Sequence, residues 1–143
     1  MRQLFSFLPF LLLISCNIKP QPIEYGVDQC AACKMIISDS RFGCELVTTK
    51  GKVFKYDAIE CLIPDVLKNG TDHYQYIMVT DFYNPGNFLT SYDARFIIDP
   101  DVPSPMGGNL SAYNKSNLDD LNGAMDFVAL VSRLSGLERY KVN

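Results

Sequence analysis

The sequence has no tryptophan, a single histidine (His73) and no cluster of basic residues. Lys and Arg total 13 against 16 Asp and Glu, which gives a formal net charge of −3. Nucleic acid is therefore not expected as a partner, because neutralising phosphates requires clustered Lys and Arg. A lone histidine leaves no Ser-His-Asp set, and the Gly107-Gly108 pair lacks the spacing and the lysine of a phosphate loop. We expect a surface position for His73 and a protein that is not an enzyme.

Long apolar runs are also scarce. The stretch from Leu4 to Ile14 is too short to span a bilayer, and with Arg2 before it the pattern is typical of a secretory signal. It ends in Leu13-Ile14-Ser15-Cys16, which resembles the lipobox of bacterial lipoproteins, where the cysteine is acylated and becomes the first residue. The resemblance implies a signal peptide over residues 1–15 and lipidation at Cys16. The protein would then be attached to a membrane of the bacterial cell envelope and face the periplasm or another extracytoplasmic side.

The rest of the chain can form a packed core. Hydrophobic residues make up 48% of the 143 residues, and eight Tyr and nine Phe supply aromatic mass. Residues 16–29 carry two prolines and few large apolar side chains, which indicates an anchor and linker. We expect the fold to begin at residue 30 and to be α+β, with a first unit over residues 30–82 and a second over 83–143.

The first unit has the pattern of strand, strand, helix, strand. Imperfect alternation around Cys44, a turn at Lys50-Gly51 and the return from Val53 to Tyr56 predict a hairpin. A third strand is predicted over residues 74–79, with tyrosines and Met78 on one face.

A helix should connect the hairpin to that third strand. Asp57 and Glu60 have the spacing of a capping box, which predicts the start of the helix. Pro64 predicts a short or kinked helix, and Asn69-Gly70 predicts its end.

The second unit repeats this order in part. Residues 94–98 and 110–113 are predicted strands, separated by a loop with three prolines and two adjacent glycines. Ser116 or Asn117 can cap a helix that ends near Gly136. Its predicted apolar stripe consists of Leu121, Met125, Val128 and Val131.

Residues 30–35, CAACKM, place three sulfur side chains close together. Thiolate and thioether ligands suit a soft monovalent cation such as Cu(I). In an extended segment Cys33 and Met35 would point the same way, and Cys30 could join them if the chain turns. The motif therefore predicts a copper site.

Other uses of these cysteines stay open. A thiol-disulfide oxidoreductase using Cys30 and Cys33 is the main alternative, although a redox motif should open a helix that follows a strand. A zinc site would need Cys44 and Cys61 as well, and those two do not form a second C-x-x-C pair. Structural disulfides are the third alternative, because an extracytoplasmic compartment permits them.

Three stretches of the sequence resemble the NosL family, the lipoprotein accessory factors of nitrous-oxide reductase: Cys33-Lys34-Met35, the run from Phe54 to Cys61, and Pro105-Met106-Gly107. The resemblance covers nearly all of the chain after the signal. It implies two small, similar strand-strand-helix-strand units. It also implies a metallochaperone that holds Cu(I) outside the cytoplasmic membrane. The implied recipient of the copper is nitrous-oxide reductase or the transporter that serves its maturation.

The resemblance also suggests site residues. Cys33 and Met35 are the first expected ligands of Cu(I), followed by Met106 and Cys30. Cys61 lies on the apolar side of the predicted helix, so we expect a structural role for it. Many family members have glycine where this chain has Lys34, which puts the detailed loop geometry in doubt but not the sulfurs.

Overall fold

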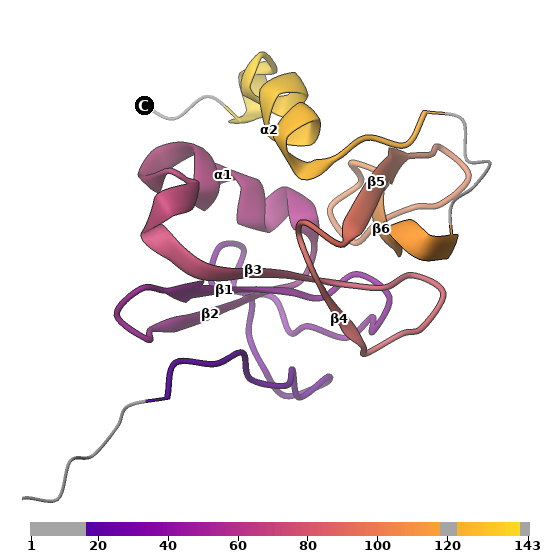
Figure 1. Ribbon diagram of the computed structural model, residues 1–143. Helices are drawn as coiled ribbons and strands as arrows, with labels where there is room; N and C mark the ends of the chain where they lie inside the picture. The colour runs from indigo at the N-terminus through magenta and orange to yellow at the C-terminus, as the bar shows by residue number, and fades with distance from the viewer. Residues whose placement is uncertain (1–16, 118–122, 141–143) are drawn as a thin grey trace, which may run out of the picture.

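The computed structural model describes residues 17–117 and 123–140. A four-stranded antiparallel sheet has the order β2-β1-β3-β4, and β5 and β6 form a second, two-stranded sheet. Two α-helices lie above the larger sheet, and the N-terminal segment runs below it (Figure 1). The predicted α+β fold is confirmed. None of the described helices has the length and apolar character needed to cross a membrane.

The predicted hairpin is present as β1 (Cys44–Thr48) and β2 (Val53–Tyr56), with Gly51 in the turn at φ +82°. All five residues of β1 are buried. The strand lies centrally in the sheet and is covered on both faces, which is why its sequence does not alternate cleanly. The face below is covered by the segment expected to be a linker: Ile23 is buried, and Gln21 N–H donates to Glu45 Oε1 at 2.9 Å.

Helix α1 (Ile59–Asn69) contains Pro64 and ends at Gly70, as predicted. The predicted capping box is wrong. Ala58 occupies the N-cap position without a side-chain hydrogen bond, and the Asp57 carboxyl is buried next to the loop before β1, where Ser38 N–H donates to it. Glu60 points instead into the loop between β5 and β6. The 3₁₀ turn η1 (Thr71–His73) leads into β3 (Tyr74–Thr80), and His73 is exposed as expected.

The first unit therefore has the predicted order of strand, strand, helix, strand. A short strand that the sequence did not predict, β4 (Phe88–Thr90), pairs with Met78–Thr80 of β3. It follows residue 83, where the second unit was predicted to begin, yet it belongs to the first sheet. The boundary between two units stays a prediction.

The second hairpin, β5 (Ala94–Ile98) and β6 (Leu110–Asn114), lies where the sequence predicted two strands. The predicted start of the second helix is wrong. Residues Lys115–Asn117 form a 3₁₀ turn, η2, and α2 (Phe127–Ser135) begins later with Asp126 as its cap. A last 3₁₀ turn, η3, covers Glu138–Tyr140.

The predicted apolar stripe of the second helix is correct only in part, because Val131 packs against the core, as does Met125, which precedes the helix. Val128 is 75% exposed, and the side chains that α2 buries are those of Phe127, Leu130 and Leu134. Leu121 lies outside the described residues. Gly136 is the C-cap, as expected. The core joins residues of both hairpins and both helices into one cluster.

Candidate metal centre

The CAACKM motif lies in a narrow reversal of the chain. Gln29 and Ile36 form an isolated antiparallel bridge, Cys30 N–H donates to Met35 O at 2.8 Å, and Lys34 N–H donates to Cys30 O at 3.1 Å. Ala31 N–H donates to Lys55 O at 2.7 Å, which attaches the reversal to the outer edge of β2. We call residues 30–35 the cysteine turn. Its tight hydrogen bonding brings Cys30 and Cys33 to one place.

Helix α1 supplies a third sulfur. Cys61 lies in the first turn of the helix, and the sulfur atoms of Cys30, Cys33 and Cys61 all lie within 4.8 Å of one another. Cys30 and Cys61 are buried, and Cys33 is half-buried at the surface of the group. We call these three residues the sulfur cluster. The four described cysteines are free thiols, so the structure contains no disulfide within residues 17–117 and 123–140.

The spacing of the sulfur cluster suits a single soft ion. Metal–thiolate bonds are about 2.3 Å long, so three sulfurs placed around one ion in a plane would lie about 4 Å apart. The observed limit of 4.8 Å therefore requires only small movements of the side chains. Thiolates favour Cu(I) and Zn²⁺ over hard cations. Among the described residues, the group contains three thiols and no fourth ligand from His, Asp or Glu. This composition favours an ion that accepts low coordination numbers.

Cys30 is the most acidic of the three thiols. The Cys61 thiol donates to its sulfur, and so do the backbone N–H groups of Asp57, Cys33 and Ala32. Together these donors lower the pKa of Cys30 to about 4, against the opposing effect of burial. These donors favour the thiolate form of Cys30 in the folded protein.

The neighbouring thiols hold their protons more strongly. Donation to Cys30, together with burial, raises the pKa of Cys61 far above that of an ordinary thiol. Burial raises the pKa of Cys33 as well, and the nearby charge on Cys30 adds to the effect. The apo cluster thus carries one negative charge and two thiol protons that a bound cation would displace.

Cys44 is also a thiol near this site, but it is not part of the cluster. It is fully buried in β1, where burial raises its pKa well above the ordinary value. Its sulfur does not belong to the group that can share an ion.

The two expected methionine ligands are placed differently. Met35 is 47% exposed, and Lys34 before it has φ +66°, so Cys33 and Met35 do not lie in the extended segment that the sequence analysis assumed. Met106 is partly buried against the core in the loop between β5 and β6. Both remain predicted ligands. The structure joins Cys30 and Cys33 to Cys61, which the sequence analysis had given a structural role.

A buried carboxylate connects the Met106 loop to the helix that carries Cys61. Glu60 is 5% exposed, and its Oε1 accepts from the Ser104 hydroxyl and, at 3.0 Å, from Gly108 N–H. Ser104 Oγ in turn accepts from Asn109 N–H at 2.9 Å. The loop is therefore fixed to the residue next to Cys61, which keeps Met106 on the same side of the protein as the start of α1.

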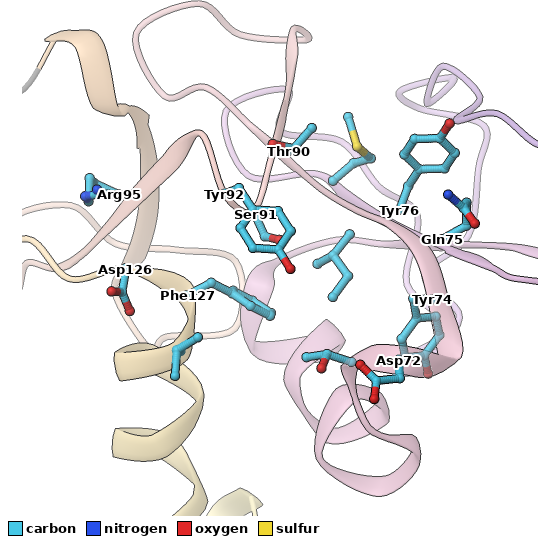
Figure 2. Close-up of a pocket in the computed structure, with 14 residues that line it drawn as sticks. Asp72, Tyr74, Gln75, Tyr76, Thr90, Ser91, Tyr92, Arg95, Asp126 and Phe127 are labelled. Carbon is cyan, nitrogen blue, oxygen red and sulfur yellow. The ribbon is translucent and has the colours of Figure 1, made fainter.

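The cavity shown in Figure 2 is a separate feature. It has a volume of about 600 Å³ and lies along β3, β4 and the start of α2, lined by side chains such as Tyr76, Tyr92 and Phe127. None of the residues that line it belongs to the sulfur cluster. The cavity is therefore not the candidate metal centre.

Comparison with known proteins supports the fold. The chain is similar to the crystal structure of the copper chaperone NosL from Shewanella denitrificans, with a TM-score of 0.56 and 19% sequence identity. The similarity covers 71% of this chain and 83% of that chain. No protein-family model and no curated protein matches the sequence. The predicted resemblance to NosL is confirmed at the level of the fold.

Proposed function

We propose that this protein binds Cu(I) as a cargo and passes it to another protein. The observation that carries the proposal is the sulfur cluster, in which three thiols from two separate elements lie within 4.8 Å of one another. Soft sulfur ligands favour Cu(I), and few ligands allow it to leave by exchange. The similarity in fold to the copper chaperone NosL supports the same function.

Cys30, Cys33 and Cys61 would supply the thiolates, and Met106 and Met35 are the candidate thioether ligands. The thiolate of Cys30, stabilised by backbone N–H groups, attracts the cation first. Cys33 is the outermost sulfur, so a competing Cys, Met or His of a partner would replace it first. Copper would then pass through an intermediate that is shared by ligands of both proteins.

The finer proposal concerns the setting. Residues 1–15 would be a signal peptide, Cys16 would be acylated, and the protein would be tethered to an envelope membrane on its periplasmic or extracytoplasmic side. The copper recipient would be nitrous-oxide reductase or the transporter for its maturation. The resemblance of residues 33–35, 54–61 and 105–107 to the NosL family supports this role.

The oxidoreductase alternative is less well supported. A redox-active C-x-x-C motif should place its low-pKa thiol at the exposed start of a helix. Here the low-pKa thiol, Cys30, is fully buried, and the motif forms a turn that no helix continues.

A competition titration with a chromogenic Cu(I) chelator tests the proposal. The full-length chain, purified in detergent and kept reduced, should bind one Cu(I). Cys30→Ser, Cys33→Ser and Cys61→Ser should each weaken binding by more than the roughly 10- to 100-fold that follows loss of a residue outside the ligand shell. Cys44→Ala is the matched control, because this buried thiol lies outside the cluster. Wild-type protein that fails to bind Cu(I) with its thiols reduced would overturn the proposal.

Transfer is tested separately. The copper-loaded chain should lose its ion faster to an apo copper-accepting protein than to an equal concentration of a bulky chelator that binds Cu(I) equally tightly. Equal rates would mean that the ion dissociates before it is captured, and this would contradict transfer through a shared intermediate.

A further inference from the structure

The first described residues are fixed to one end of the larger sheet. A methyl group placed on Gly51, in the β1–β2 turn, would lie 3.5 Å from Cγ1 of Ile18. Further along, Gln21 N–H donates to Glu45, and Lys55 Nζ donates to Pro22 O at 2.8 Å. The segment therefore lies against the sheet from Ile18 onward, and it enters the fold at the β1–β2 turn (Figure 1).

Three lysines surround this point of entry. Lys19 follows Ile18, and Lys50 and Lys52 flank Gly51; all three are exposed. None of them takes part in the ion pairs found among the described residues. The adjacent turn η1, whose His73 O accepts from Thr49 N–H at 3.1 Å, brings one acidic residue, Asp72. We call Lys19, Lys50 and Lys52 the lysine surface, and its net charge is positive in a chain that is acidic overall.

The sulfur cluster lies at the opposite end of the same elements. Asp57 lies at the far end of the hairpin from the β1–β2 turn, and its backbone N–H donates to the Cys30 sulfur. From Cys61 in its first turn, α1 runs to Asn69, which at 1.5 Å per residue is about 12 Å toward η1. Strand β1 spans a similar distance, about 14 Å, between its two ends.

We propose that the lysine surface faces the membrane and lies on anionic lipid headgroups, so that the sulfur cluster points away from the bilayer. This rests on the lipid anchor in the proposed function. Ile18 is two positions after Cys16, so the acylated residue can be at most about 7 Å from the entry point. That distance is within a Debye length of about 8 Å at physiological salt, where lysines and anionic headgroups still attract each other.

This orientation defines the kind of partner that can reach the metal. A copper recipient must meet the sulfur cluster on the side away from the headgroups, either as a soluble protein or through a part that projects from the membrane. The lysines would also prevent the tethered domain from tumbling, since each basic residue near an anionic surface shifts the bound population by about fivefold.

Lysine labelling on vesicles tests the orientation. The full-length lipidated chain is incorporated into phosphatidylcholine vesicles with and without phosphatidylglycerol. It is then labelled with a water-soluble amine reagent, and each lysine is followed by mass spectrometry. Lys19, Lys50 and Lys52 should react at least about fivefold more slowly on the anionic vesicles. Lys34, beside the sulfur cluster, and Lys115 should react at equal rates on both and serve as internal controls.

Charge reversal provides the matched variant. Lys50→Glu/Lys52→Glu should remove the protection of Lys19, whereas Lys115→Glu should leave it in place. Equal labelling of all five lysines on both kinds of vesicle, or protection of Lys34, would overturn the orientation.

The mass of the N-terminal peptide shows whether Cys16 is acylated, which tests the lipid anchor separately from copper binding. An unacylated peptide would overturn the anchor and the orientation together. Cu(I) binding measured in the same sample reports independently on whether the protein carries copper.

Discussion

The main-chain N–H of Gly108 donates a hydrogen bond of 3.0 Å to the carboxylate of Glu60, a residue 48 positions earlier in the chain. Through this contact the loop that carries Met106 meets the first turn of the helix that carries Cys61. Two stretches that resemble the NosL family and lie far apart in sequence are thereby held together.

Gly108 should not tolerate a side chain. A Cβ at this position would lie 2.6 Å from Cγ and Oε1 of Glu60, which is buried and already hydrogen-bonded. We expect Gly108→Ala to lower the free energy of unfolding by about 1–3 kcal/mol, as overpacking does. Urea unfolding measures this. Gly136→Ala is the control, because the nearest atom there is 3.8 Å away, and its effect should stay within about 0.5 kcal/mol. Equal effects at both glycines would contradict the close approach.

Lys34 should be a position that prefers glycine. Its φ of +66° is in the left-handed region, where a side chain costs about 1–2 kcal/mol. The midpoint of urea unfolding should therefore lie at a higher urea concentration for Lys34→Gly than for Lys34→Ala. The alanine variant removes the hydrogen bond from Nζ to Ala31 O but keeps the Cβ, so the difference between the two variants isolates the backbone strain. An alanine variant as stable as the glycine variant would show that the turn relaxes.

The stability of the reduced apo protein should depend on pH through Cys30. Its pKa is lowered to about 4 in the folded state, whereas an unfolded cysteine titrates near about 8.5. Between these values the unfolded chain binds the proton and the folded chain does not, so the free energy of unfolding should rise with pH. Cys33 and Cys61, whose pKa values are raised, should reverse this trend above about 8.5. The free energy of unfolding, measured with urea at each pH, should lose its rise with pH in Cys30→Ser. The Cys44→Ala variant should keep that rise.

Proton release should reveal which sulfurs hold copper. Cys30 is already a thiolate at neutral pH, while Cys33 and Cys61 carry protons. A site made of all three should release one proton from each of the latter two. A site made of Cys30, Cys33 and methionines should release only the proton of Cys33. Calorimetry in buffers with different ionisation enthalpies measures the number of protons released. If all three cysteines bind copper, Cys61→Ser should release one proton fewer than the wild type. If Cys61 is not a ligand, this variant should release as many protons as the wild type.

The methionines are tested by substitutions that conserve volume. Met35→Leu and Met106→Leu should each lower Cu(I) affinity, because leucine cannot supply a thioether. The free energy of unfolding should change by less than about 1.5 kcal/mol in each variant. Met78→Leu is the control, since Met78 lies in β3 beside the cavity of Figure 2. Affinities equal to wild type in both test variants would leave the cysteines as the only protein ligands.

Local patterns were enough to predict much of the fold. The β1–β2 hairpin, α1 with its end at Gly70, and the pair β5 and β6 follow from alternation, helical spacing and turn residues. Strand β4 has only three residues and is stabilised by pairing with β3, so the pattern within it was too short to detect.

The errors arose where tertiary contacts replaced local ones. Asp57 and Glu60 have the spacing of a capping box, but one carboxylate accepts from Ser38 N–H and the other from Ser104 and Gly108. The second helix starts at Phe127, where Asp126 Oδ1 accepts from Ala129 N–H at 2.8 Å. No rule of spacing tells which of several polar residues will be used by a distant segment.

Two of the three residues of the sulfur cluster could be predicted from the sequence. The C-x-x-C spacing and the resemblance to NosL indicated Cys30 and Cys33. Cys61 is separated from them by a hairpin, and its position on the apolar side of α1 suggested an ordinary buried residue. Only the folding of the cysteine turn onto the edge of β2 brings the third sulfur within reach.

That attachment also matters for aggregation. Strand β2 is an outer strand of the larger sheet, and an outer strand with free N–H and C=O groups is a template for pairing with other chains. The bond from Ala31 N–H to Lys55 O, 2.7 Å long, makes the cysteine turn a cover for part of this edge. The residues that gather the sulfurs thus also protect the sheet, so a variant that opens the turn exposes both a reactive thiolate and a strand edge.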